Sequence, residues 1–389
     1  MAVLALAACA PTTAGPGTSA SGSGVTQVAI TLTGDTGDAC TVSPDSVPAG
    51  PVTFTVTNRS STGITELELL DGARILGEKE NLAPGLPAVS FTLTLGGGRY
   101  SVYCPGAQTP NTPFTVTGAA APTATGDAAQ LLQQGTAEYG QYVATQIAGM
   151  VTAVANLETA VDSGDVAAAQ EKYALARPFY EKVESDVSGF LLPGAAPTSN
   201  RGNLDYLIDM RASSLDPAVG WSGLHAIERD LWQGGAITDQ TKKYASDLVS
   251  NVTELASLAQ GLNYRPEDLA NGAAALLEEI QSNKISGEEE RYSHLDLLDF
   301  AANIEGAQQA FAALQPGLTR IDPALAATVA REFGTVNGML DIYRDASIPG
   351  GFTYYTPAVR AADGAALSKA VQALQEPMSQ IAEKVATAQ

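Results

Sequence analysis

The alternation of hydrophobic and polar residues changes character once along the chain, near residue 120. Before that point apolar residues alternate with small or polar ones, for example at 51–58 and 89–95, and this period of two is typical of β-strands. Beyond it the alternation disappears, and Ala, Leu, Glu, Gln and Lys dominate in long stretches that favour helices. The pattern therefore predicts a multidomain β + α protein, with a small β-sandwich followed by an all-α domain.

The predicted β domain covers residues 25–117. Strands are expected at 25–33, 51–58, 89–95 and 100–104, with prolines and glycines between them as turn signals. Short strands at such spacings indicate an antiparallel sandwich. Their order, with Cys104 directly after the penultimate strand, resembles the cupredoxin fold. A blue-copper site needs two histidines, and this domain has none, so the sequence argues against copper here.

Two cysteines, Cys40 and Cys104, lie in this domain. A cysteine pair in a small sandwich outside the cytoplasm is most often a disulfide. The alternative is a metal site of two thiolates with help from Glu66 or Glu68, which alternate along a possible strand and point the same way. Exposed glutamates on the outer face of a sheet explain the same spacing, so the sequence leaves these interpretations open.

Residues 118–126, rich in Ala, Thr, Pro and Gly, indicate a linker to a helical domain at 127–389. We expect helices at 127–161, 164–188, 203–212, 218–232, 239–261, 264–283, 291–315, 322–346 and 359–387. Their lengths favour stacked bundles. Comparable helix counts on either side of residues 221–232 suggest a double helix bundle.

The stretch 221–232 holds both tryptophans and one of only two histidines. His225 and Glu228 are three residues apart, so on a helix their side chains share one surface and can reach one metal ion. This spacing alone is weak evidence, because a glutamate paired with a helical histidine explains it as well. A metal site therefore needs further ligands elsewhere in the chain.

Two further clusters offer carboxylates. Glu181 and Glu184 repeat the three-residue spacing, and like charges so placed repel unless a cation or a base lies between them. Arg177, one turn earlier, is a candidate for that base. Asp209 follows three apolar residues, a position that is usually partly buried, but it can also simply pair with Arg211.

A third cluster begins with three adjacent glutamates, Glu288, Glu289 and Glu290, and continues to His294. Around it polar residues recur at intervals of four, three and four, at Tyr292, Asp296, Asp299 and Asn303. A polar stripe of this kind usually faces solvent. The triple glutamate and the second histidine beside it leave open that the stripe faces a site instead.

The net charge of −21 bears on the choice of partner. So acidic a surface repels phosphate backbones and attracts cations, which argues against nucleic acid. Most of the imbalance lies in the helical domain, because residues 127–389 carry 34 acids against 17 bases, whereas residues 25–117 carry 8 against 4.

The first residues indicate a targeting signal rather than a folded element. They form a short apolar run ending in Leu6-Ala-Ala-Cys9, which is too short to span a bilayer. The ending looks like a bacterial lipobox, in which the cysteine is lipidated. Residues 10–24, rich in Pro, Thr, Gly and Ser, then form a flexible tether. Residues 1–24 therefore predict an extracytoplasmic lipoprotein that is anchored to the cell membrane through Cys9.

Together these residues resemble the imelysin-like family, also known as M75 peptidases, and within it iron-uptake proteins in which a cupredoxin-like domain precedes the imelysin-like domain. The matching motifs are Gly223-Leu-His-Ala-Ile-Glu228 with Leu231-Trp232, Arg177-x-x-Tyr180-Glu181-x-x-Glu184, Asp209-x-Arg211, residues 285–290, Ser293-His294-x-Asp296 and residues 303–306. The resemblance implies a metal site between helices of the C-terminal domain. It also implies an iron permease and a haem peroxidase as partners.

Carried over by position, the resemblance implies as ligands His225, Glu228, Glu181, Glu184, Asp209 and Glu289, with Glu288, Glu290, His294, Asp296, Asp299 and Arg211 in a second tier. One imidazole amid several carboxylates is a hard, anionic site that suits iron (Fe2+ or Fe3+) or zinc better than copper(I). Gathering so many carboxylates is costly without a cation. We therefore expect a bound cation to hold them together, and we expect capture of iron outside the cytoplasm and its delivery to a permease.

Two other functions remain open. The peptidase label of the family suggests a zinc metallopeptidase, although such enzymes commonly carry H-E-x-x-H and this chain has no such motif. A copper-assisted ferroxidase, with copper in the first domain acting on iron in the second, would need Cys40 and Cys104 as free thiolates.

Overall fold

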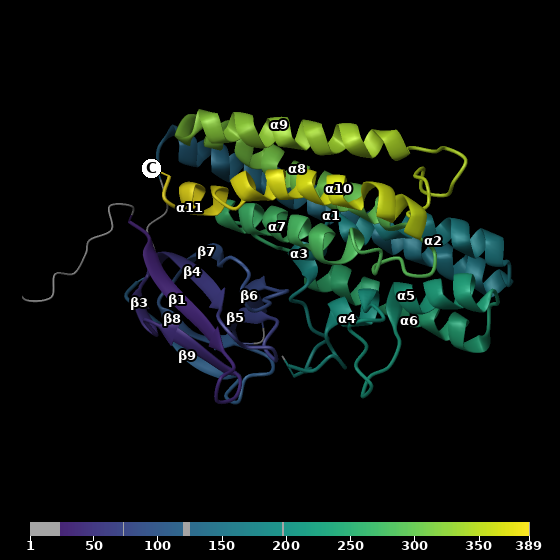
Figure 1. Cartoon of the computed structure of the whole chain (residues 1–389), viewed down its shortest axis with the longest axis horizontal. Coiled ribbons are helices and arrows are strands. Elements are labelled where there is room, and N and C mark those ends of the chain that lie inside the picture. Colours follow the sequence, from purple (N-terminus) through teal and green to yellow (C-terminus); the bar gives the residue numbers. More distant parts are fainter. Residues whose placement is uncertain (1–23, 73, 120–124, 197, 389) are drawn as a thin grey trace, which may run out of the picture.

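The computed structural model describes residues 24–72, 74–119, 125–196 and 198–388, so Cys9 and its predicted lipidation lie outside the described residues. A β-sandwich packs against one side of an elongated bundle of helices (Figure 1). The predicted order of a β domain and an all-α domain is thereby confirmed. None of the described helices combines the length and the apolar content that crossing a lipid bilayer requires.

The β domain consists of two sheets with the strand orders β2-β1-β4-β7 and β3-β9-β8-β5-β6. The strands are β1 Thr26–Thr33, β2 Ala39–Ser43, β3 Ser46–Pro48, β4 Gly50–Asn58, β5 Leu67–Asp71, β6 Arg74–Lys79, β7 Val89–Leu95, β8 Gly98–Tyr103 and β9 Asn111–Thr117. The sandwich is not purely antiparallel as predicted, because β1 pairs with β4, and β3 with β9, in parallel. The chain crosses to the second sheet at β3 and returns at β4, which places β4 beside β1 in the same direction.

Apolar side chains that alternate along the strands fill the space between the sheets. Phe54 of β4 is fully buried and stacks on Phe91 of β7 with 5.1 Å between ring centroids. Cys104, also fully buried in this core, forms a disulfide with Cys40. The disulfide interpretation of the two cysteines therefore agrees with the structure, and neither sulfur is a free thiolate in it.

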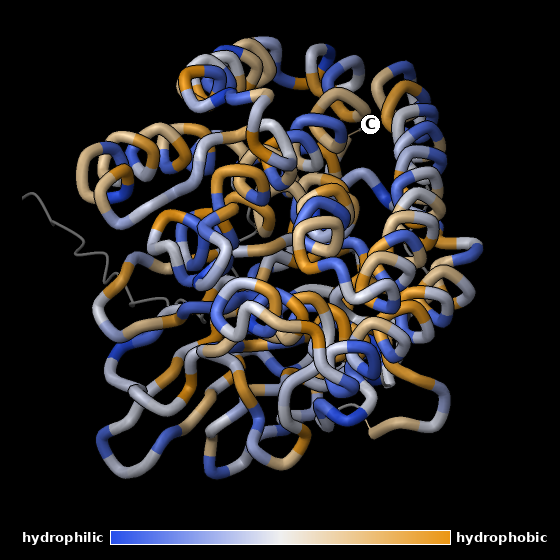
Figure 2. The backbone as a smooth tube through the Cα atoms, turned by 90° about the vertical axis from the view of Figure 1, so that its right-hand side faces the viewer, coloured by the Kyte–Doolittle hydropathy of each residue, from blue (hydrophilic) through white to orange (hydrophobic). Residues whose placement is uncertain are grey.

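The helical domain contains α1 Asp127–Ser163, α2 Val166–Glu181, α3 Glu184–Val187, α4 Leu204–Asp209, α5 Gly223–Glu228, α6 Asp239–Leu258, α7 Pro266–Glu279, α8 Asp296–Ile321, α9 Pro323–Leu340, α10 Pro357–Met378 and α11 Ile381–Ala386, with a 3-10 turn η3 at Asp341–Tyr343. Orange and blue segments alternate along these helices in Figure 2, as expected for helices that bury one face. Their ends follow local signals. Gly164 adopts a left-handed conformation after α1, and the Asp165 side chain accepts a hydrogen bond from the Ala168 N–H at 3.0 Å, which caps α2.

The helices nearest the predicted metal ligands are shorter than expected. α2 ends at Glu181, so Glu184 begins the separate one-turn helix α3, and the two glutamates do not share a helix face as predicted. α8 begins at Asp296 instead of residue 291. Two π-helical segments, η1 at Arg229–Gly234 and η2 at Ile280–Lys284, continue α5 and α7. Such segments are often found at functional sites.

The two domains are joined by specific polar contacts. Lys79 of β6 forms an ion pair with Glu278 of α7 at 2.7 Å. The Asn271 side chain donates to the Thr92 carbonyl oxygen at 2.7 Å, where α7 runs beside β7. These contacts place one edge of the sandwich directly over α7.

Candidate metal centre

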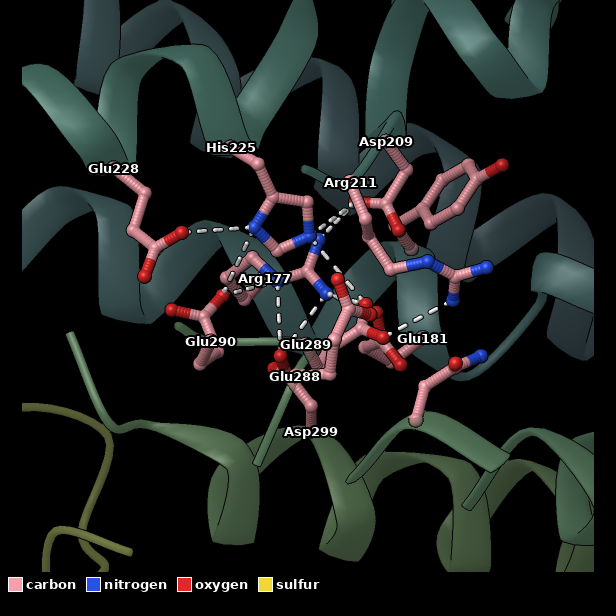
Figure 3. Close-up of polar contacts among 12 residues, drawn as sticks. Arg177, Glu181, Asp209, Arg211, His225, Glu228, Glu288, Glu289, Glu290 and Asp299 are labelled. Atoms are coloured by element: carbon pink, nitrogen blue, oxygen red, sulfur yellow. Dashed lines mark hydrogen bonds and ion pairs between the residues drawn. The ribbon is translucent and has the colours of Figure 1, made fainter. Parts of the chain in front are cut away.

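A group of charged side chains fills the interior of the helical domain, between α2, α4, α5 and the segment that leads from residue 288 into α8 (Figure 3). Figure 3 shows Asp209, His225 and Glu228 turned toward the acidic side chains of residues 288–290 and Asp299, with Arg177 between them. Apart from Glu288, each member is at most 5% exposed. The polar stripe of α8 therefore faces the interior, which corrects the expectation that such stripes face solvent.

One glycine allows α5 to approach α4. Gly223, the first residue of α5, has a φ of +69°, and an added Cβ would lie 2.0 Å from the Ile208 carbonyl oxygen. Only glycine fits this position, because it lacks the side chain that would clash and tolerates positive φ. The close approach brings His225 of α5 to Asp209 of α4.

A second glycine allows α8 to approach the end of α2. An added Cβ at Gly306 would lie 2.3 Å from the Lys182 carbonyl oxygen. One turn earlier, the Asn303 side-chain N–H group donates to the Glu181 carbonyl oxygen at 2.8 Å and to Glu181 Oε2 at 3.0 Å. These contacts fix the Glu181 carboxylate toward the centre of the group.

Arg177 lies at the centre of this group of side chains. Its guanidinium contacts five carboxylates, those of Glu181, Asp209, Glu289, Glu290 and Asp299. The contacts to Glu289, Glu290 and Asp299 measure 3.1, 3.0 and 3.0 Å. Arg177 is thus the base beside Glu181 that the sequence suggested, and Asp209 pairs with Arg177 and not with Arg211.

His225 presents one ring nitrogen that has no partner. Its Nδ1 lies 3.1 Å from Glu228 Oε2. Its Nε2 is buried without a hydrogen bond, 3.6 Å from Asp209 Oδ1 and 3.4 Å from Glu289 Oε1. A buried, unpaired imidazole nitrogen that faces two carboxylates is the geometry expected of a metal ligand.

The Glu228 carboxylate is already engaged on both oxygens. Oε1 accepts hydrogen bonds from the backbone N–H groups of Tyr292 and Ser293, each at 2.7 Å, and Oε2 faces His225 Nδ1. A carboxylate on the far nitrogen of a histidine fixes the tautomer and orientation of the ring. In the structure His225 and Glu228 thus contact each other, whereas the sequence suggested that both bind one ion.

The three adjacent glutamates point in different directions. Glu289 faces His225 and Arg177, as the positional match favoured. Glu290 accepts a hydrogen bond from the Tyr173 hydroxyl at 2.7 Å. Glu288 accepts one from the Ser213 N–H at 3.2 Å at the edge of the group.

Lys284 is a member that the sequence reasoning missed. It is 1% exposed, and its Nζ lies 3.1 Å from Glu181 Oε2 and 3.4 Å from Glu289 Oε2. Glu279, 3.3 Å from the same Nζ, was missed as well. A search for the bases that must accompany clustered acids would have drawn attention to Lys284, which stands four residues before the triple glutamate.

Internal bases offset much of the acidic charge. Eight carboxylates lie within 4.0 Å of the nitrogens of Arg177, Arg211, Lys284 or His225, and they belong to Glu181, Glu184, Asp209, Glu228, Glu279, Glu289, Glu290 and Asp299. We expected a bound cation to hold such acids together, and the structure shows that internal bases provide part of the positive charge. Arg177, Arg211 and Lys284 supply three positive charges, which still leaves a surplus of acids.

Neighbouring charges shift the pKa values inside the group in opposite directions. Burial acts to raise the pKa of Glu289, but Lys284, Arg211 and His225 hold it well below its ordinary value. Burial raises the pKa of Asp209 to about 6, although Arg177 and His225 oppose the rise. Burial and Arg177 act to lower the pKa of His225, yet Asp209, Glu228 and Glu289 outweigh them and raise it well above its ordinary value.

Two sets of three ligand atoms are close enough to surround an ion. Atoms of Asp209, His225 and Glu289 lie within 4.8 Å of one another, as do atoms of Glu181, Glu289 and Asp299. Glu289 belongs to both sets. The donors are one imidazole nitrogen and carboxylate oxygens, which fit iron or zinc.

Several predicted residues lie elsewhere. Glu184 Oε2 is 4.0 Å from Lys284 Nζ but borders a cavity between the domains, together with Glu66 and Glu68. Asp296 accepts a hydrogen bond from the Glu290 N–H at 3.1 Å, which shapes the loop before α8. None of the described ion pairs of the centre involves His294, which has a φ of +61° in that loop.

Comparison with known sequences relates the chain to bacterial iron uptake. The sequence pattern of the imelysin family matches residues 135–381. The chain is 35% identical to the iron uptake system component EfeO of Yersinia pestis over 341 residues, which cover 86% of this chain and 85% of the relative. It is 33% identical to the EfeO protein of Escherichia coli K12 over 365 residues, which cover 92% of this chain and 91% of the relative.

Proposed function

Because the chain belongs to the imelysin (M75 peptidase) family and is similar to EfeO iron uptake components over most of its length, we propose that it binds iron as a component of an iron uptake system. One observation carries the choice of site. His225 Nε2 is buried and unpaired between Asp209 and Glu289. Iron is the cargo of this site, and the protein releases it unchanged.

The proposed ligands are His225 Nε2 with carboxylate oxygens of Asp209 and Glu289. Glu181 and Asp299, which contact Arg177, are further candidate ligands. Glu228 orients the imidazole. Because the pKa of His225 lies well above its ordinary value without metal, binding of iron displaces a proton from the ring. Acidification therefore favours release.

We propose that the protein works outside the cytoplasm as a lipoprotein anchored through Cys9. Its cargo would pass to a membrane permease of the EfeU type, and a haem peroxidase of the EfeB type would act in the same system. A lipid anchor would keep the bound iron close to the permease. Net charge of −21 favours accumulation of cations near the protein and argues against nucleic acid as a partner.

The two histidines of the chain provide a matched test. His225→Asn removes the unpaired nitrogen, whereas His294→Asn changes the same residue type in a left-handed position that asparagine tolerates. Equilibrium dialysis against ferrous iron without oxygen should show binding at least about tenfold weaker for His225→Asn. Binding by His294→Asn should equal that of the wild type. Unchanged affinity in His225→Asn would refute the site.

The burial of the candidate ligands argues against a zinc peptidase. A catalytic zinc needs an open coordination position that water and substrate can reach, whereas the candidate ligands are at most 5% exposed. Cleavage of a peptide library that depends on added zinc and is lost in His225→Asn would revive this alternative. A copper-assisted ferroxidase is disfavoured because Cys40 and Cys104 are joined in a disulfide.

A further inference from the structure

Arg177 contacts the same carboxylate oxygens that face the unpaired nitrogen of His225 (Figure 3). Its Nη1 contacts Asp209 Oδ1, and its Nη2 lies 3.1 Å from Glu289 Oε1. His225 Nε2 lies 3.6 Å from the first of these oxygens and 3.4 Å from the second. An ion held by these oxygens must therefore share them with the guanidinium or displace it.

The second set of close ligand atoms surrounds the same guanidinium. Glu181, Glu289 and Asp299 offer oxygens that lie within 4.8 Å of one another. Nη2 of Arg177 contacts all three carboxylates, and it lies 3.1 Å from Glu289 and 3.0 Å from Asp299. This nitrogen thus lies among the three side chains, where a cation bound by them would lie.

We propose that Arg177 is a built-in cation that sets how many iron ions the buried centre holds and how tightly it holds them. The guanidinium occupies the position among Glu181, Glu289 and Asp299, so the wild type binds a single ion at His225. It also weakens the binding of that ion, because it competes for Asp209 and Glu289. The inference rests on the proposed function for the ion at His225.

The positive charge of Arg177 is always present. The side chain is fully buried, and a guanidinium keeps its proton throughout the pH range in which proteins are folded. An imidazole or a carboxylate can change its charge by titration, whereas this group cannot. An iron ion that enters the centre therefore meets a fixed positive charge at every pH.

The position that Arg177 occupies has unused ligand oxygens beside it. Oδ1 of Asp299 and Oδ1 of Asn303 are buried and have no hydrogen-bond partner. These residues are four apart on α8, so their side chains share one face of the helix. The Asn303 side chain donates to Glu181 Oε2 at 3.0 Å, which places it next to the set. Because buried polar atoms are rarely left unpaired, these oxygens would be available to an ion in place of the guanidinium.

Lys284 is positive and buried as well, but it lies on the other side of the shared acids. Its Nζ contacts the Oε2 atoms of Glu181 and Glu289, at 3.1 and 3.4 Å, whereas Arg177 contacts the Oε1 atoms of both. None of the described ion pairs joins Lys284 to Asp209 or Asp299. Lys284 therefore offsets charge without occupying the position between the acids, which makes it a matched comparison for Arg177.

A built-in cation suits a protein that passes its iron on. Buried carboxylates that lose their only cation are left without compensation, which is costly. Here the guanidinium remains beside Asp209 and Glu289 and compensates them when iron leaves. The affinity is then lower than that of the same carboxylates without an arginine, and the release of iron is easier.

Counting bound iron tests the proposal. Anaerobic equilibrium dialysis against ferrous iron, followed by metal analysis, should give one equivalent for the wild type and two for Arg177→Met. A neighbouring arginine changes the affinity of a carboxylate for a proton by about tenfold or more, and we expect the first iron to bind at least about tenfold more tightly in this variant. Damage to the fold would only weaken binding, so a gain of iron cannot come from misfolding.

Three further variants show whether the position of the charge matters. Arg177→Lys keeps a positive charge at the same site and should bind one equivalent. Lys284→Met removes a buried charge from the other side of the acids, so it should tighten binding but add no second equivalent. Arg331→Met removes an arginine whose side chain is 63% exposed and should bind iron as the wild type does. Two equivalents in Lys284→Met would show that net charge alone sets the number of ions, and the proposal would be overturned.

The second ion should depend on Asp299 and not on His225. Arg177→Met/Asp299→Asn should lose the second equivalent, whereas Arg177→Met/His225→Asn should retain one. If His225→Asn alone leaves wild-type binding unchanged, the proposed iron site fails, but a gain of iron in Arg177→Met would still support the role of Arg177. A single equivalent of wild-type or lower affinity in folded Arg177→Met would overturn it.

Circular dichroism covers the case in which Arg177→Met does not fold without metal. Ferrous iron should then restore the helical signal, because cations replace the guanidinium among the acids. A variant that stays unfolded in saturating iron would show that cations do not take its place, and the proposal would be wrong.

Discussion

The two acidic groups of this protein differ in how their charge is balanced. At the buried centre eight carboxylates surround Arg177, Arg211, Lys284 and His225, and the guanidinium of Arg177 alone contacts five of them. The cavity between the domains is also lined by eight carboxylates, but Arg211 is the one base among its lining residues. Glu184 and Glu279 belong to both groups.

Clustered acids do not by themselves indicate how a metal would be held. At the centre the internal bases offset part of the charge of the acids, and a metal at this site would have to compete with Arg177 for them. The cavity has only Arg211 as a base among its lining residues, so most of its acids rely on protonation. Variants that remove a base or an acid should therefore affect the two groups in opposite ways.

Removal of Arg177 should have the largest effect. Arg177→Met leaves buried carboxylates without their shared partner, and loss of one member of a buried ion network costs about 3–5 kcal/mol of unfolding free energy. Urea unfolding in the presence of a chelator measures this. Arg331→Met removes an arginine whose side chain is 63% exposed and should cost less than about 0.5 kcal/mol. Similar losses for both variants would contradict the role of Arg177.

A change in the backbone that positions His225 should have the second largest effect on the free energy of unfolding. Gly223→Ala forces a side chain into the Ile208 carbonyl and into positive φ, so we expect a loss of about 2–3 kcal/mol together with weaker iron binding. Gly334→Ala is the control, because a Cβ there meets nothing within 4 Å in an exposed part of α9. That variant should gain up to about 1 kcal/mol. Equal effects in urea unfolding would contradict the packing argument.

The architecture was predictable from residue patterns because it depends on local signals. The change of hydrophobic period near residue 120 separates the domains, and Thr238 caps α6 through a hydrogen bond from the Thr241 N–H at 3.2 Å. Strands β2, β3, β6 and β9 escaped prediction, β5 was anticipated only as a possible strand around Glu66 and Glu68, and the parallel pairs were not foreseen. Strand pairing depends on how the chain crosses between sheets, which local alternation does not encode.

The site was predictable in its composition but not in its roles. His225, Asp209, Glu181 and Glu289 do converge, as the resemblance implied. The role of Glu228 was hidden, because the backbone donors that hold it lie 64 and 65 residues further on. Similarly, Glu184 lies at the edge of the centre, beside the cavity between the domains, because α2 stops at Glu181, and spacing within a presumed helix cannot reveal that end.

The cavity should make stability depend on pH. The pKa of Glu66 is raised to about 8 and that of Glu68 to about 7, chiefly by burial, against an ordinary value of 4.5. Between pH 5 and 8 the folded state therefore keeps protons that the unfolded chain has lost, so stability without metal falls as pH rises through this window. Glu78, Glu80, Glu184 and Asp205 face the same cavity, and their pKa values are raised as well, chiefly by burial, so they act in the same direction. Glu279 and Arg211 also face it but pair with each other, and the pKa of Glu279 is lowered.

Thermal unfolding in a chelator from pH 5.5 to pH 8 measures this dependence. Tm of the wild type should fall across the range. Glu66→Gln/Glu68→Gln should show a shallower slope and a higher Tm than the wild type at pH 8, because two of the repelling groups no longer ionise. Parallel curves for the two proteins would show that these carboxyls do not contribute.

The smallest expected effect is the response to salt. Raising potassium chloride from 0.1 to 1 M shortens the screening length from about 10 Å to about 3 Å, which weakens repulsion among half-buried charges more than interactions inside a dry cluster. The wild type should therefore gain about 0.5 kcal/mol relative to Glu66→Gln/Glu68→Gln in urea unfolding with chelator. The cost of Arg177→Met should stay the same at both concentrations, because its partners are fully buried apart from Asp209 at 5% exposure. If salt changed the stability cost of Arg177→Met as much as it changed the effect of Glu66→Gln/Glu68→Gln, both groups would be accessible to solvent. The contrast between them would then be lost.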